Sequence, residues 1–218
     1  MSIAERPLRA DAARNRARLL VAARDVFAER GLDATMDEVA RRAGVGVGTA
    51  YRRFRNRDDL IAALFEERLE EFGGVLDAAL ADGDPWRGLT GFLERSMEMQ
   101  AEDRGFKELL LQSADGRERM QRFHEHIRPL VAELVRRAQA TGELRPDVVE
   151  HDVLLVSLMT GAVADAAQTV EPQLWRRALA LQIDGLRARR DAPASLPVGP
   201  LDNEQADRTA AAWRPGRR

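Results

Sequence analysis

The chain of 218 residues contains no cysteine, so it can form no disulfide and carry out no thiolate chemistry. Aromatic residues make up only 5%, with a single tyrosine. Long apolar runs are also missing: the longest, around residues 153–164, is too short to span a bilayer and contains Ser157 and Thr160. The first residues lack the apolar core of a secretion signal. We therefore expect a cytoplasmic protein with no membrane partner.

Acidic and basic residues nearly balance, and the formal net charge of −2 would by itself disfavour binding to nucleic acid. The charge is unevenly distributed, however. Residues 1–60 carry 13 Arg against 9 Asp and Glu, a net charge of +4, which leaves −6 for the remainder. A basic end on an otherwise acidic protein orients that end toward a polyanion.

Residues 35–60 predict two short helices joined by a glycine turn. Thr35 and Glu38 have the spacing of a capping box at the start of the first helix. Small and apolar residues then recur at helical spacing on one face. Gly44 supplies the left-handed residue that commonly ends a helix. This is the order of elements found in a helix-turn-helix.

The second short helix is predicted to begin near Val47, with Val47, Ala50 and Phe54 facing inward. Its free face would carry small, hydroxyl and guanidinium groups, which suit DNA backbone and base edges. Arginine-rich faces are usually just solvated, so the pattern alone leaves both DNA binding and ordinary helical packing open. The residues predicted to face outward are Gly48, Thr49, Tyr51, Arg52 and Arg53.

The same stretch resembles the DNA-binding domain of the TetR family of bacterial transcriptional regulators. An amphipathic first helix over residues 14–31 also fits that family, so the resemblance covers about residues 11–65. Two positions depart from the pattern: Gly46 stands where the family often has Ser, and Val47 where it often has Lys or another polar residue. The family's Gly-Thr-x-Tyr-x-x-Phe signature and the basic residue after it are matched in register by Gly48, Thr49, Tyr51, Phe54 and Arg57.

The resemblance implies an all-α protein with an N-terminal three-helix helix-turn-helix DNA-binding domain over residues 1–57. A long helix would join it to a C-terminal helical domain for effector binding and dimerisation over 58–190. Residues 191–218, rich in Pro, Ala, Gly and charge, are expected to be a disordered tail. Residue chemistry and the resemblance together assign DNA contact to Thr35, Val47, Gly48, Thr49, Tyr51, Arg52, Arg53 and Arg57.

The rest of the chain is predicted to be helical. Asn56 is a good N-cap for the long helix, and Pro85 suits the first turn of the next one. A helix over 115–140 contains Pro129, which should kink or split it. Residues 148–167 form a helix that is apolar nearly all round at its centre, so it must be buried on more than one side. A final helix is expected over 172–189.

One buried side of the 148–167 helix is expected to be a second subunit, since two recognition helices related by a twofold axis can read a palindromic operator. A monomer with a thick core is the alternative. The predicted dimer interface consists of Leu155, Leu158, Met159, Trp175, Leu179 and Ile183.

The resemblance also implies a pocket for an unknown small-molecule effector that releases a repressor from DNA. A ligand can do so only if it binds two conformations with different affinity. Each candidate lining residue is more often ordinary core than part of a pocket. The candidates are Trp86, Met97, Phe106, Leu110, Phe123, His126, Leu130 and Met159.

Other classes of function are weakly supported. His124 and His126 are two residues apart, about 200° around a helix, so they cannot chelate a metal as a pair. We expect no metal, no cofactor and no enzymatic activity. A helical protein-interaction module, or an enzyme that binds no nucleic acid, remains the alternative to a homodimeric DNA-binding regulator.

Overall fold

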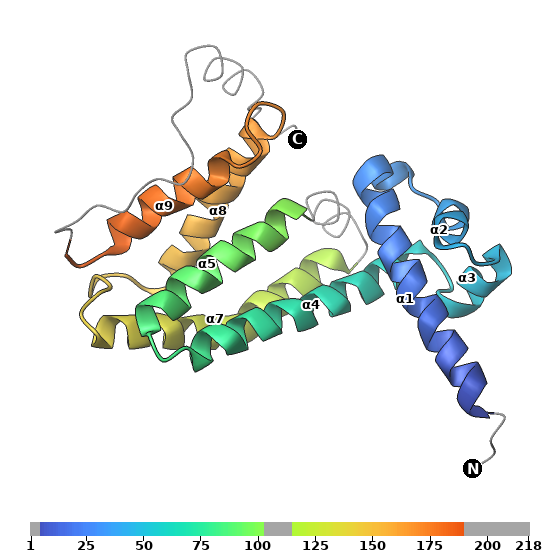
Figure 1. Cartoon of the computed structure of the whole chain (residues 1–218), viewed down its shortest axis with the longest axis horizontal. Coiled ribbons are helices and arrows are strands. Elements are labelled where there is room, and N and C mark those ends of the chain that lie inside the picture. Colours follow the sequence, from blue (N-terminus) through green and yellow to red (C-terminus); the bar gives the residue numbers. More distant parts are fainter. Residues whose placement is uncertain (1–4, 103–114, 190–218) are drawn as a thin grey trace. The chain divides into compact units, whose positions relative to one another are not determined.

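The computed structural model describes residues 5–102 and 115–189, and within these ranges the protein is built from helices (Figure 1). Strand-like pairing in this part is limited to one isolated antiparallel bridge between Leu144 and Arg187. The fold is therefore all-α, as predicted. The elements are α1 (Glu5–Arg30), the 3-10 turn η1 (Gly31–Asp33), α2 (Met36–Ala43), α3 (Val47–Arg53), α4 (Arg57–Ala81), α5 (Pro85–Glu102), α7 (Gly116–Ala140), α8 (Glu150–Ala167) and α9 (Leu174–Leu186).

The helices divide into two compact units. The first comprises residues 1–71 and 103–124, and the second comprises 72–102 and 125–218. Helices α4 and α7 each contribute residues to both units. The division falls between Glu71 and Phe72, inside α4, whereas the functional boundary predicted after residue 57 coincides with the start of that helix.

The first unit packs α1, α2 and α3 around one apolar core (Figure 1). Phe27 and Val39 are at most 1% exposed, and Leu60 and Leu64 of α4 close the same core. A fully buried Leu or Phe contributes about 1.5–3 kcal/mol relative to an exposed one. These contacts fix the two short helices, which would be marginal alone.

The second unit has its own core, formed by α5, α8, α9 and parts of α4 and α7. One face of α5 is buried in this core along Trp86, Leu89, Leu93 and Met97. The backbones of α4 and α5 approach closely at Gly88, where a Cβ would lie only 2.5 Å from the carbonyl oxygen of Ala79. A side chain at this position would force the two helices apart.

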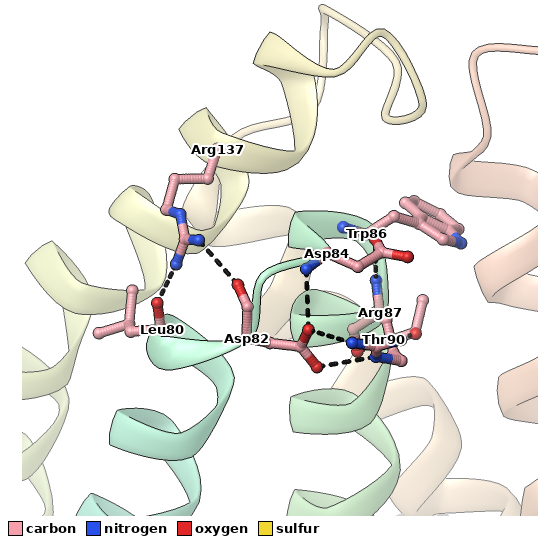
Figure 2. A network of polar contacts seen from close by, with 7 residues as sticks. All are labelled: Leu80, Asp82, Asp84, Trp86, Arg87, Thr90 and Arg137. Atoms are coloured by element: carbon pink, nitrogen blue, oxygen red, sulfur yellow. Dashed lines mark hydrogen bonds and ion pairs between the residues drawn. The ribbon is translucent and has the colours of Figure 1, made fainter.

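A polar network ties the corner between α4 and α5 to α7 (Figure 2). Arg137 of α7 donates to the backbone oxygens of Leu80 and Asp82, which lie at the end of α4. Asp82 accepts two hydrogen bonds from Arg87, at 2.9 and 2.6 Å, and one from the amide of Asp84 at 2.8 Å. These bonds hold the pKa of Asp82 down at about 2, the Arg87 guanidinium being the main cause.

Some boundaries differ from those predicted. Helix α1 begins at Glu5 rather than near residue 14. Helix α7 runs unbroken from Gly116 to Ala140, so Pro129 does not split it. The predicted tail over 191–218, together with Phe106 and Leu110, lies outside the described residues.

Candidate nucleic-acid interface

The start of α2 is held by the predicted capping box. The Glu38 amide donates to Thr35 Oγ1 at 3.3 Å, and the Thr35 amide donates to Glu38 Oε2 at 3.0 Å. The Thr35 hydroxyl also donates to Glu38 Oε2 at 3.0 Å. The backbone bond from Thr35 is the main cause of the lowered pKa of Glu38. Thr35 is exposed, but its hydroxyl proton is already engaged and cannot at the same time be donated to a phosphate.

The turn between α2 and α3 requires a glycine. Gly44 has φ 63°, the left-handed conformation that L side chains rarely adopt. Arg18 of α1 donates from Nη2 to the carbonyl oxygen of Gly44 at 3.2 Å. A Cβ on Gly44 would lie 2.7 Å from that same nitrogen. The turn that aims α3 is therefore fixed both by backbone conformation and by a brace from α1.

Helix α3 presents one buried and one exposed face. Ala50 and Phe54 are buried, as predicted, at 0% and 5% exposure. The prediction that Val47 faces inward was wrong, because its side chain is 42% exposed. Val47 is the first residue of α3, and the helix contacts the core only from Ala50 onward. Tyr51 is 46% exposed, which excludes the alternative of a core aromatic.

The two arginines of α3 differ in their contacts. Arg52 folds back onto its own helix, where Nε donates to the Gly48 carbonyl oxygen at 3.2 Å and Nη2 donates to Thr49 Oγ1 at 3.1 Å. Arg53 is exposed and makes no hydrogen bond or ion pair within residues 5–102 and 115–189. Because Thr49 Oγ1 accepts from a cation, its own hydroxyl proton is left to be donated outward. The hydroxyl proton of Thr49 is thus free to be donated, whereas that of Thr35 is already donated to Glu38.

Arg57, at the first turn of α4, lies against the first core rather than projecting freely. Its Nη2 donates to the Gly31 carbonyl oxygen at 3.5 Å, and its guanidinium lies 5.7 Å from the centre of the Phe27 ring. Its Nε is buried without a hydrogen-bond partner in the described part of the chain. The predicted N-cap of α4 is confirmed, since the Asp59 amide donates to Asn56 Oδ1 at 2.8 Å.

Three other arginines of the first unit differ in their contacts. Arg18 braces the turn, as described above. Arg55 is 87% exposed between α3 and α4 and bonds Asp59 at 2.9 Å, which lowers the pKa of that carboxyl. Arg41 is exposed in the last turn of α2, and no described residue forms an ion pair with it. The two adjacent arginines at 41–42 are visible in the sequence as a basic pair. The sequence could not show that Arg42 is paired with Glu29 while Arg41 is not.

The predicted effector-lining residues are distributed over both units. Trp86 and Met97 are buried in the second core, and Leu130 packs against it. Phe123 instead packs against the first core. His126 is exposed, and Met159 is 52% exposed on α8. Their role in ligand binding stays a prediction.

The predicted dimer residues fall into two groups. Leu155, Leu158 and Met159 are each more than half exposed. Trp175 and Leu179 were misassigned, because they are only 2% and 1% exposed in the single chain and leave no area for a partner. Ile183 is partly buried against the second core. The apolar residues missed by the prediction but exposed on the same two helices are Leu154 and Leu181.

Two features are absent from the residues that the structure describes. No group of three His, Asp or Glu side chains in that part of the chain is arranged to hold a metal ion. None of the helices there is long and apolar enough to cross a membrane.

Comparison with protein families gives two matches. Residues 19–64 match the family described as bacterial regulatory proteins, tetR family. Residues 84–188 match the family described as transcriptional regulator SbtR-like, C-terminal domain. The first match spans the surface described above, and the second covers most of the second unit.

Individual proteins give the same result. A TetR transcription regulatory protein from Mycobacterium vanbaalenii is 34% identical, with a TM-score of 0.64 over 83% of this chain and 99% of that one. A TetR transcriptional regulator from Streptomyces coelicolor is 28% identical, with a TM-score of 0.58 over 79% and 98%. An HTH-type transcriptional regulator of Staphylococcus aureus strain USA300 is 35% identical over 66 residues, which are 30% of this chain and 36% of that protein. The chain therefore matches only about a third of the length of its curated relatives.

Proposed function

The chain belongs to the TetR family of bacterial transcriptional regulators and carries that family's helix-turn-helix domain, and on this premise we propose a homodimeric repressor that a small molecule releases from a palindromic operator. The relatives are transcription regulators and not enzymes. A regulator of this kind acts where the bacterial chromosome lies, so we place it in the cytoplasm. The observation that carries the proposal is the exposed polar face of α3 on a rigidly braced turn.

In this proposal α3 enters the major groove and its residues divide the work. Thr49 and Tyr51 donate hydroxyl protons to phosphate oxygens, which are acceptors only. Arg52 orients the Thr49 hydroxyl, and Arg53 provides a free guanidinium for a base edge or a phosphate. Gly48 lets the backbone approach the duplex, and Val47 contributes apolar contact.

Thr35 and Arg57 act more indirectly. The Thr35 hydroxyl is committed to the capping box, so its contribution is the position of α2 and of the free amides at its start. Arg57 packs on Phe27 and links α1 to α4, and it reaches a phosphate only by leaving the Gly31 carbonyl oxygen. These two residues stabilise the positions of the helices that pack around α3.

Dimerisation is supported by exposed apolar side chains on α8 and α9. Leu154, Leu155, Leu158, Met159 and Leu181 are each between 43% and 55% exposed in the single chain. A contiguous exposed apolar face is costly in water and commonly marks a subunit interface. Two helices from each subunit would form a four-helix interface related by a twofold axis.

The test uses duplexes selected by the wild-type protein from fragments of the host genome, with affinity measured over a range of salt concentrations. The wild type should show a steep salt slope, since phosphate contacts release counterions. Thr49→Val and Tyr51→Phe should weaken binding of all duplexes without changing that slope, because neither removes a charge. Arg53→Ala should reduce the slope by about 1 if it contacts phosphate, or relax sequence preference if it reads a base.

Thr35→Val is the matched control for Thr49→Val. It removes a helix cap, so it should lower the free energy of unfolding by about 0.5–2 kcal/mol, whereas Thr49→Val should leave stability nearly unchanged. A wild-type protein that binds no duplex even at low salt would end the proposal.

A further inference from the structure

Two uncharged polar residues are buried in the second unit. Ser96 of α5 is 3% exposed and Thr160 of α8 is 0% exposed. These are the sole buried polar side chains among the described residues, and no charged side chain in that part of the chain is buried. Buried hydroxyl groups in proteins nearly always have a hydrogen-bond partner.

Gln182 of α9 is bonded to one of these two residues. Its Nε2 donates to Thr160 Oγ1 at 2.8 Å and to the Ala178 carbonyl oxygen at 3.2 Å, so both amide protons are used. Its Oε1 is buried and accepts no hydrogen bond from any described residue. Ser96 Oγ is likewise buried and without a partner in the described ranges.

Helix α5, which carries Ser96, packs against both α8 and α9 (Figure 1). Gln100 lies one turn after Ser96 on α5, and its Oε1 is 3.7 Å from where a Cβ would stand on Gly161 of α8. Gly161 directly follows Thr160. Three helices that contact one another within one compact unit therefore each contribute a polar side chain to otherwise apolar packing.

The unused hydrogen-bonding capacity defines the chemistry that would satisfy it. Gln182 Oε1 needs a donor, and the Thr160 hydroxyl, which already accepts one bond, has its proton free to donate. The Ser96 hydroxyl can do either. An ion bound here would lose its water without gaining a counter-charge. Glu98 of α5 and Arg176 of α9 already neutralise each other, since they bond at 2.7 Å.

We propose that Ser96, Thr160 and Gln182 form the polar end of a binding site for an uncharged ligand with an apolar body and both a donor and an acceptor, such as a primary amide or an alcohol. The binding site stands on the unsatisfied buried atoms. Its role as the effector site rests on the proposed function.

The probes are straight-chain primary amides from butanamide to decanamide, each compared with the carboxylate of the same chain length. Thermal unfolding of the full chain is followed with each probe. At least one amide should raise Tm, and no carboxylate should match it. Ser96→Ala and Thr160→Val should reduce the affinity for that amide at least about tenfold, as expected when a site's polar group is lost.

Ser96→Ala should also raise Tm of the ligand-free protein, because it removes a buried hydroxyl that has no partner. The variant thus gains stability while losing ligand response, which general damage to the fold would not produce. Ser157→Ala is the control, since its hydroxyl on α8 bonds the Val153 carbonyl oxygen at 3.1 Å. That variant should keep the full Tm shift.

The inference is overturned if no amide shifts Tm, if carboxylates shift it equally, or if Ser96→Ala retains the full shift. DNA affinity is measured separately with the selected duplex. An amide that binds at these residues without weakening DNA binding would leave the site intact and remove the release step of the proposed function.

Discussion

Helices α3 and α8 lie in different units, and each has one exposed face. The exposed face of α3 is polar, and that of α8 is apolar. The free face of α3 carries Thr49, Tyr51 and Arg53, which water solvates well. The free face of α8 carries Leu155 and Leu158, which water solvates poorly. A polar face is stable in solvent and suits transient binding, whereas an apolar face is unfavourable in water and suits a permanent interface.

This contrast explains how the two units divide the proposed function. The α8 face is suited to a second copy of the chain, and the α3 face to a polyanion. Since each of these leucines is about half exposed, completing its burial against a partner would contribute about 0.7–1.5 kcal/mol, half the value for a fully exposed side chain. Reversible DNA binding depends instead on contacts that salt weakens.

The largest expected effect comes from breaking the α8 face. Leu155→Glu with Leu158→Glu places two charges in the proposed interface and should convert the dimer to a monomer. DNA affinity should then fall by about 100-fold or more, because the two recognition helices are no longer linked. Sedimentation and titration of a selected duplex measure the two effects.

Val21→Glu is the matched control, since Val21 is 63% exposed on α1 in the other unit. It should leave the molecular mass in solution unchanged. If the double variant stays dimeric, the interface lies elsewhere and the comparison between the two faces fails.

A smaller effect is expected from the turn that aims α3. Gly44→Ala places a side chain at φ 63° and against Arg18, so it should lower the free energy of unfolding by about 1–3 kcal/mol. Gly48→Ala, inside α3 with open space around it, should instead stabilise by about 0.5–1 kcal/mol. Both should weaken DNA binding, Gly44→Ala through the turn and Gly48→Ala through a methyl group on the DNA-facing side. Equal stability of the two variants in chemical denaturation would show that the turn is not constrained.

The smallest effect concerns the corner of the second unit shown in Figure 2. Since the pKa of Asp82 is lowered from 3.8 to about 2, its ionised form favours the folded state. This contribution is fully present above about pH 4 and is lost as the pH falls toward 2. Asp82→Asn should therefore flatten the dependence of Tm on pH across that window. Asp147→Asn, which removes an exposed carboxyl bonded to neighbouring Arg145, should flatten it less. Identical pH profiles for wild type and Asp82→Asn would contradict the assignment.

Local signals in the sequence predicted the helix-turn-helix well. The capping box at Thr35, the left-handed Gly44 and the N-cap at Asn56 each depend on residues within four positions, so their spacing was enough. The buried and exposed faces of α3 followed from helical periodicity, except at Val47. Val47 is the first residue of the helix and precedes the first residue that contacts the core.

What the sequence could not assign were contacts between residues far apart in the chain. Sequence placed Trp175 and Leu179 on a dimer face, but packing buries both inside one chain and leaves Leu154 and Leu181 exposed. The brace from Arg18 to Gly44, and the partners of Arg52 and Arg57, were equally invisible.

The sequence by itself determined the helical class, the turn chemistry and most of the exposed face of α3, because these depend on short-range spacing and backbone preference. Only the tertiary structure decided which apolar side chains remain exposed, which hydroxyl protons are free, and where buried polar atoms lack partners. Those properties depend on what each side chain meets after the helices have packed, and helical periodicity says which residues share a face but not what covers it.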